Sequence, residues 1–318
     1  MTEVIGNLKE AEDKIPGIDQ NEPVSEKTTY YVCLFQGTSD DFTTIDWPIY
    51  KNLRDKVDTI ITTAPQDTII DLWLDSPGGS AHVAFKIMLL LRSRCSYLRV
   101  VVPDFAKSAA TLMVIGADER IMPLHAELGP LDVQMQHPDR EEEYVSAIDI
   151  VRSLEKISSD AINLVISGGA EVLRYTHSKR QETLSAMLQF AAEFMKPIVG
   201  KLDATMIHRA YNELQVAKQY AKRLIDMRVE KDIPPIKIEG LVNNFTDDYP
   251  SHGFVICPKE LDRIGLKTLS MDNYEMGNIV KEMLVMSDKS TKSLVEIFKK
   301  EDLQSIFNPG VNNEAPGK

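Results

Sequence analysis

The feature that most constrains this chain is a pair of consecutive strand-to-helix crossings with small residues at their turns. The first runs from Leu72 through Asp-Ser-Pro-Gly to Gly79, and the second leads to Ser108. A glycine pair lets backbone N–H groups turn toward a ligand, because glycine tolerates conformations closed to other residues. A serine at the mouth of an apolar helix can present its hydroxyl to the same place. These groups would supply an oxyanion hole and a nucleophile, the parts that acyl transfer most requires.

Segments of alternating strand and helix character surround these two turns. Strands are predicted over short β-branched, aromatic and apolar runs at 30–36, 68–74, 97–102 and 119–122. Helices are predicted between them, at 45–61, 81–92 and 108–116. This alternation is typical of an α/β fold with a largely parallel sheet. In such sheets ligands bind where the carboxyl ends of strands meet helix N-termini, which is where the glycine pair and Ser108 are expected.

The second half of the chain is predicted to be mostly helical. Residues 137–143 are predicted to form a charged, solvated loop. Residues 144–228 are expected to form long helices broken near Gly168-Gly169 and Pro197. A compact unit follows, with a strand at 254–256, a helix at 258–264 ended by Gly265, and further helices at 275–286 and 293–300.

This pattern divides the chain into three parts. Residues 1–27 are expected to be a flexible N-terminal tail and residues 28–270 the main domain. Residues 271–318 are expected to be a helical C-terminal tail with a disordered end.

Composition excludes several classes of function. A formal net charge of −12 argues against a nucleic-acid surface, since phosphate contacts require clustered lysine and arginine. The three cysteines (Cys33, Cys95 and Cys257) are widely spaced and indicate neither a disulfide framework nor a zinc site. No metal-ligand spacing or phosphate-binding glycine loop stands out, so no cofactor or metal is expected. The N-terminus lacks the apolar core of a signal peptide and no apolar run could span a bilayer, which predicts a cytoplasmic protein.

Four segments, in this order, resemble the ClpP/crotonase-like serine peptidases. Within that superfamily the similarity is greatest to the serine dehydrogenase proteinase (SDH) family, a relative of the SppA-type signal peptide peptidases. The segments are Leu72–Gly79, Ala106–Thr111, Ala126–Gln134, and Tyr249–Ile256 with Lys259–Leu266. The third contains Leu-Gly-Pro-Leu-Asp, similar to the Leu-Gly-Pro-Ile-Asp-Pro-Gln of SDH proteins, with Val133 in place of the last proline. The resemblance covers residues 30–267.

The resemblance implies a repeated β-β-α spiral with a mostly parallel sheet, plus a helical C-terminal region. It also implies a serine peptidase that acts on a peptide or protein substrate and assembles into a homo-oligomer. The apolar helical segments at 161–228 would suit subunit packing. Any unfolding ATPase or other regulatory protein would be a separate chain, since no phosphate-binding loop is present.

The resemblance also suggests roles for individual residues. Ser108 would attack the acyl carbon, and the N–H groups of Gly78 or Gly79 and of Ala109 would bind the oxyanion. Ser108 also has a plainer interpretation, because serine is a favoured N-cap that binds the first free N–H groups of a helix. The glycine pair is equally compatible with an ordinary turn.

The identity of the general base stays open, because ClpP-type enzymes use His and Asp whereas SppA-type enzymes use a lysine. Pro130 falls where the ClpP histidine would lie. His252 is one candidate, with Asp248 near the position of the ClpP acid, although this histidine could instead hold its turn by hydrogen bonding. Lys156 is the other candidate and follows Ser108 at the sort of distance seen in SppA-like enzymes. A catalytic lysine must be desolvated, and the neighbours of Lys156 indicate a wet surface.

Two rival functions remain compatible with the sequence. The first is a catalytically inactive ClpP-like scaffold or binding module, which the missing histidine at the ClpP position favours. The second is acyl-CoA chemistry on the crotonase scaffold, which would require adenine-nucleotide binding.

Overall fold

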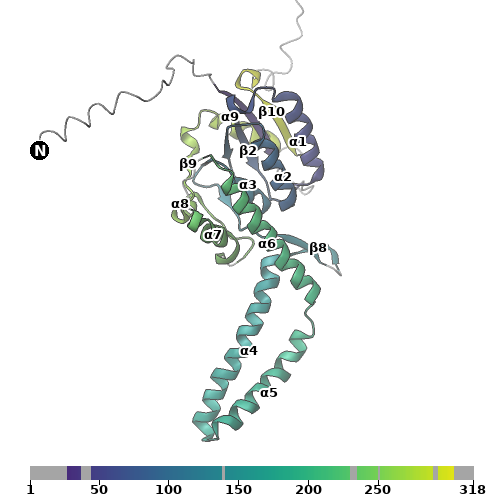
Figure 1. The fold of residues 1–318 in the computed structure, drawn as a ribbon, viewed down its shortest axis with the longest axis vertical. Helices are drawn as coiled ribbons and strands as arrows, with labels where there is room; N and C mark the ends of the chain where they lie inside the picture. Colours follow the sequence, from purple (N-terminus) through teal and green to yellow (C-terminus); the bar gives the residue numbers. More distant parts are fainter. Residues whose placement is uncertain are drawn as a thin grey trace, which may run out of the picture.

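The computed structural model describes residues 27–36, 44–137, 140–229, 235–249, 251–288 and 293–303. A six-stranded sheet lies at its centre (Figure 1). Its strands, in spatial order, are β10 (Leu294–Phe298), β1 (Thr28–Phe35), β2 (Thr68–Asp75), β3 (Tyr97–Val101), β5 (Glu119–Met122) and β9 (Leu269–Ser270). Neighbouring strands are parallel except for β10, which runs antiparallel to β1. The predicted α/β class with a largely parallel sheet is therefore confirmed.

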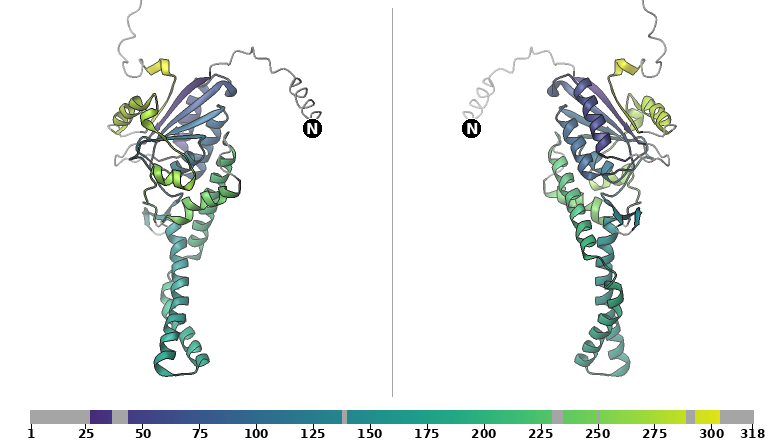
Figure 2. Two further views of the ribbon diagram at one scale, coloured as in Figure 1. Left: turned by 90° about the vertical axis from the view of Figure 1, so that its left-hand side faces the viewer. Right: turned by 90° about the vertical axis from the view of Figure 1, so that its right-hand side faces the viewer.

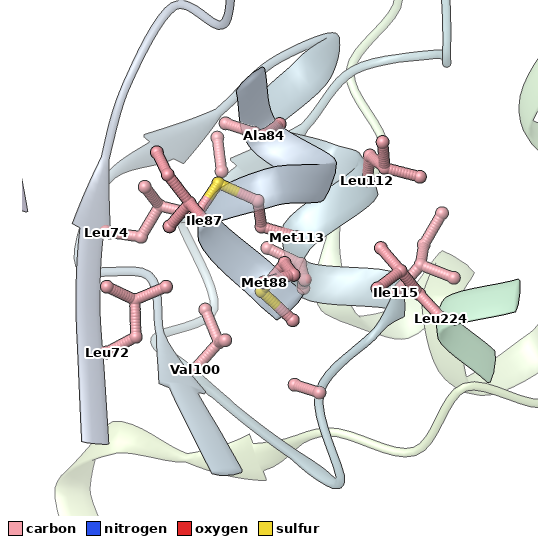
Figure 3. Close-up of a cluster of buried hydrophobic side chains, with 14 of the residues drawn as sticks. Leu72, Leu74, Ala84, Ile87, Met88, Val100, Leu112, Met113, Ile115 and Leu224 are labelled. Carbon is pink, nitrogen blue, oxygen red and sulfur yellow. The ribbon is translucent and has the colours of Figure 1, made fainter. Parts of the chain in front are cut away.

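Helices cover both faces of the sheet and enclose two cores. The larger core packs under α1 (Trp47–Ile60), α2 (Ala81–Arg92), α3 (Ala109–Ile115), α6 (Ala204–Asp226), α7 (Pro235–Asn243) and α8 (Pro258–Ile264). The smaller core packs under α9 (Gly277–Asp288). Successive side chains of a strand point to opposite faces. Leu72 and Leu74 therefore enter the larger core (Figure 3), while Trp73 enters the smaller one.

Local capping sets where these helices begin. The Asp46 carboxylate accepts from the Ile49 N–H at 3.0 Å before α1, and the Ser80 hydroxyl accepts from the Val83 N–H before α2. Each cap satisfies an N–H group that has no partner within its helix. The strands and helices predicted between residues 30 and 122 are all present, with small shifts at their ends.

A buried polar network ties the smaller core to the sheet. The Asp71 carboxylate, fully buried on β2, binds the Arg99 guanidinium at 2.6 and 2.8 Å and accepts from the Tyr274 hydroxyl at 2.5 Å. The Trp73 indole N–H donates to the same hydroxyl at 3.0 Å. Burial raises the pKa of Asp71 although Arg99 opposes the shift. The segment before α9 is thus held to the middle of the sheet.

The long helices α4 (Ala147–Thr176) and α5 (Arg180–Val199) form a hairpin that projects from the sheet (Figures 1 and 2). The prediction of a break at Gly168-Gly169 was wrong, because α4 continues through both glycines and ends at Thr176. A Cβ atom on Gly168 would lie 2.7 Å from Cε of Met187 on α5, so the missing side chain allows close helix packing. The break predicted near Pro197 is present, since Pro197 lies within the last turn of α5, which ends at Val199.

Three further predictions need correction. His137 and residues 140–143 lie in β7 (Gln134–His137) and β8 (Arg140–Ser146), which pair antiparallel, rather than in a plain loop, because backbone pairing does not require an apolar sequence. The expected strand at 254–256 reduces to one antiparallel bridge between Leu128 and Ile256. The expected helix at 293–300 is instead strand β10, whose alternating Leu-Val-Glu-Ile-Phe pairs with the edge of β1.

The C-terminal part is therefore not an appended helical tail. Helix α9 closes the second face of the sheet and β10 forms its edge, so residues 271–288 and 294–298 belong to the same packing unit. The predicted flexible start and disordered end lie outside the described residues. None of the described helices is both long and apolar enough to cross a membrane.

Candidate active site

The two predicted crossings meet at the carboxyl end of β2. Gly78 and Gly79 have φ angles of +105° and +141°, which side chains rarely tolerate. A Cβ atom on Gly78 would lie 2.6 Å from the Lys107 carbonyl oxygen and 2.9 Å from Cβ of Ser108. A Cβ atom on Gly79 would lie 2.6 Å from the backbone of Ile45. The glycine pair is thus required for close approach, and it brings the first turn against Ser108.

Ser108 occupies the turn before α3 in a backbone conformation unusual for its residue type. Its φ is +49°, in a region where a non-glycine residue is strained, and such strain is concentrated at functional sites. It stands at the N-cap position of α3, but its side chain makes no capping hydrogen bond. The hydroxyl instead donates to the Asp132 carbonyl oxygen at 2.5 Å. Ser108 is 6% exposed, so its hydroxyl is nearly enclosed.

The three predicted oxyanion donors differ in what they bind. The Gly78 N–H donates to the Ser76 hydroxyl at 3.0 Å, and that hydroxyl donates in turn to the Gln36 side chain. Within the described residues, the N–H groups of Gly79 and Ala109 have no hydrogen-bond partner. Ala109 opens α3, where the first N–H groups have no acceptor inside the helix. Gly79 and Ala109 are therefore the two donors still available to a ligand.

His252 lies beside an acid that the sequence analysis did not single out. Its Nδ1 is 3.0 Å from Oδ2 of Asp132, whose side chain is fully buried, while the His252 side chain is 32% exposed. The ring is turned so that these two atoms do not complete a well-angled hydrogen bond. The other carboxylate oxygen of Asp132 accepts from the Ile148 N–H at 3.0 Å. Asp132 thus contacts Ser108 through its carbonyl and His252 through its carboxylate.

Short pairings in the backbone bring these distant residues together. Strand β4 (Phe105–Ala106), just before Ser108, pairs with β6 (Glu127–Leu128), which leads to Asp132. Leu128 and Ile256 exchange N–H···O bonds of 2.9 and 3.0 Å, which ties the same segment to the chain just after His252.

The other predicted site residues lie elsewhere. Lys156 is on α4, about 13 Å along the helix from its start, where its 74% exposed side chain pairs with Asp160 at 2.5 Å. Asp248 is exposed at the end of the π-helical turn Asn244–Asp248. Among the described residues, no hydrogen bond or ion pair joins Lys156 or Asp248 to Ser108 or His252. A catalytic lysine must be desolvated, and the exposed position of Lys156 beside Asp160 does not favour it as a base.

Asp132 is the functional candidate that the sequence analysis missed. It ends the Leu-Gly-Pro-Leu-Asp run that carried part of the family resemblance, so its signal was present. Its partner His252 lies 120 residues further along, and no local pattern joins the two. The described residues contain no group of three or more His, Cys, Asp or Glu side chains arranged to hold a metal ion.

Comparison with known proteins assigns the chain to a family. Residues 24–189 match the model of the ClpP-like SDH-type serine proteinases, and the chain belongs to this family. The match includes Ser108 and Asp132, whereas His252 lies beyond it. The mixed α/β architecture with a mostly parallel sheet is consistent with a ClpP-like fold.

Two similar proteins are both uncharacterized proteins of Methanocaldococcus jannaschii. One is 36% identical over 118 residues, which cover 36% of this chain and 38% of the relative. The other is 34% identical over 124 residues, which cover 37% of this chain and 41% of the relative. The chain therefore spans less than half the length of the curated relatives it matches.

The close approach at Gly78 can be tested by substitution. Gly78→Ala should lower the free energy of unfolding by about 1–3 kcal/mol, because the φ of +105° strains any side chain and the new methyl group meets backbone. Gly240→Ala is the matched control, since nothing lies within 4 Å of a Cβ there and alanine favours the helix. Denaturant unfolding followed by circular dichroism measures both. Equal effects of the two substitutions would contradict the close approach.

Proposed function

We propose that this chain is a cytoplasmic serine peptidase in which Ser108 is the nucleophile, His252 the general base and Asp132 the acid that orients the base. One observation carries the proposal: Asp132 contacts both the Ser108 hydroxyl, through its carbonyl, and the His252 ring, through its carboxylate. Membership in a family of serine proteinases supports the same chemistry. The order of the three residues along the chain is serine, aspartate, histidine.

The proposed reaction proceeds through an acyl-enzyme. The Ser108 hydroxyl turns from the Asp132 carbonyl toward Nε2 of His252, because Nδ1 faces the Asp132 carboxylate. The oxygen attacks the peptide carbonyl carbon while its proton passes to Nε2. His252 then gives this proton to the departing amine, and a water molecule, deprotonated by the same ring, releases the acyl group.

The oxyanion would be bound by the N–H groups of Gly79 and Ala109, which have no other acceptor in the described chain. The loss of one such donor typically costs about 3 kcal/mol of transition-state stabilisation. The Gly78 N–H is bound to Ser76 and could join only if that bond were broken. In this arrangement Gly78 acts mainly by allowing the two turns to approach.

Replacement of the nucleophile provides the first test. Ser108→Ala should abolish both peptide hydrolysis and covalent labelling by a fluorophosphonate, because the attacking oxygen is removed. The circular dichroism spectrum should remain that of the wild type. A wild-type chain that no fluorophosphonate labels would favour the inactive scaffold, and a labelled Ser108→Ala variant would exclude Ser108 as the nucleophile.

The identity of the acid provides a second test. Asp132→Asn should lower kcat for a peptide substrate by about 10⁴-fold, as expected when the residue that orients a catalytic histidine loses its charge. Asp248→Asn removes the same charge from an exposed residue in the same region and should leave kcat unchanged. The opposite result would assign the acid to Asp248. Denaturant unfolding should show that both variants are folded at the assay temperature.

We also propose that copies of this chain assemble through the α4–α5 hairpin. ClpP-like proteases usually form oligomers. Residues 147–199 hold about one sixth of the chain but eleven of the twenty-two exposed large apolar side chains in the described residues. Ile162 and Ile166 on α4 and Leu188, Phe190 and Phe194 on α5 are each more than half exposed. Apolar exposure concentrated in this way is typical of an interaction surface.

The charge distribution favours a second copy as the occupant of this surface. The hairpin carries six acidic and six basic residues, so the net charge of −12 belongs entirely to the rest of the chain. Two copies would repel each other over their acidic surfaces, whereas the neutral hairpins can meet without this cost. A self-complementary contact between two copies of one patch is the commonest symmetric interface.

Charge introduced into the hairpin tests this assembly. The double variant Leu188→Glu/Phe194→Glu should shift the protein toward the monomer in size-exclusion chromatography with light scattering, because it places carboxylates in the apolar contact. Tyr211→Glu, on the exposed surface of α6, is the control and should leave the mass unchanged. A monomeric wild type, or binding of the hairpin to lipid vesicles instead of to itself, would contradict the proposal.

A further inference from the structure

The segment that precedes His252 is held by an arginine of the projecting helix. The Arg152 guanidinium, in the second turn of α4, donates to the Asp247 carbonyl oxygen at 2.5 Å and to the Tyr249 carbonyl oxygen. These two acceptors lie five and three residues before His252. The guanidinium presents its donors in a rigid fork, so binding two carbonyls at once fixes the backbone between them.

The same end of α4 also holds the partner of His252. The Ile148 N–H donates to Oδ1 of Asp132 at 3.0 Å, and Arg152 follows Ile148 by four residues. The N–H groups of the first turn of a helix have no acceptor inside it, which leaves the Ile148 N–H available to Asp132. The first turn of α4 therefore contacts Asp132, and the second turn contacts the segment leading to His252.

Other contacts on this segment act on side chains. Lys218 of α6 binds the Asp247 carboxylate at 2.8 and 3.0 Å, and the Tyr249 ring stacks on Phe254 with centroids 4.8 Å apart. Burial raises the pKa of Tyr249 to about 12, so its phenol stays neutral near neutral pH. These contacts stabilise the turn, but it is Arg152 that connects its backbone to the helix that holds Asp132.

We propose that Arg152 is a positioning residue that sets the orientation of His252 relative to Asp132 and Ser108. This inference rests on the proposed function, since it assigns His252 the role of base. Arg152 does not touch the reacting atoms, and its effect passes through the segment that it binds. Small displacements of a catalytic group of about 1 Å can lower the rate about 10²-fold, so loss of this contact should affect the chemical step.

Two substitutions and a control test the inference. Arg152→Met should lower kcat for a peptide substrate by about 10- to 100-fold with KM unchanged, because the base is displaced but substrate binding is not. The rate of fluorophosphonate labelling of Ser108 should fall in parallel. Arg152→Lys retains the positive charge but loses the planar fork of donors, and it should give intermediate values. Arg174→Met removes an arginine from the far end of the same helix and should match the wild type.

The outcomes separate this inference from the proposed function. If the wild type is labelled at Ser108 but Arg152→Met is labelled as fast as Arg174→Met, the positioning role is overturned while the peptidase proposal stands. If Arg152→Met instead raises KM while the labelling rate is unchanged, Arg152 acts in substrate binding. That result would also overturn the positioning role. Should Arg152→Met fail to fold, Arg152→Lys decides, since a folded lysine variant with wild-type kcat contradicts the inference. An unlabelled wild type would contradict the proposed function itself.

Discussion

The arrangement of the candidate site depends on the way Asp132 divides its contacts. Its carbonyl accepts the Ser108 hydroxyl, while its two carboxylate oxygens face Ile148 and His252. A buried carboxylate is costly unless polar partners surround it, and the Ile148 N–H at the start of α4 satisfies one of its two oxygens. Ser108, His252 and the start of α4 are therefore connected through one residue that is not in any regular strand or helix.

Asp132 can make these contacts because hydrogen bonds to two other parts of the chain hold the segment that leads to it. The Thr111 hydroxyl of α3 donates to the Gly129 carbonyl at 2.9 Å, and the Leu131 N–H donates to the Phe245 carbonyl at 2.8 Å. The first bond ties the segment to the helix that follows Ser108, and the second ties it to the region that precedes His252. Loops that are held in this way can carry catalytic groups on a rigid scaffold.

The local parts of the site were predictable and the long-range parts were not. Gly78, Gly79 and Ser108 follow strands whose apolar pattern is plain, and parallel order brings such turns to one edge. The pairing of His252 with Asp132 is supported by long-range backbone contacts such as the bridge between Leu128 and Ile256, which leaves no periodic signal. Strand β10 was predicted to be a helix because a short segment such as Leu-Val-Glu-Ile-Phe is ambiguous until the edge of β1 provides its partner.

The position of α4 explains why a site of this kind lies where the sheet meets the hairpin. The first turns of α4 contact Asp132 and the segment before His252, whereas its later turns carry the exposed apolar residues. A continuous α-helix is stiff along its axis, since each turn is hydrogen-bonded to the next. Forces applied to the hairpin would therefore reach Ile148 and Arg152 through an element without a hinge in its interior. Glycines 168 and 169 do not weaken this element, because Met187 of α5 packs against them and the helix runs through unbroken.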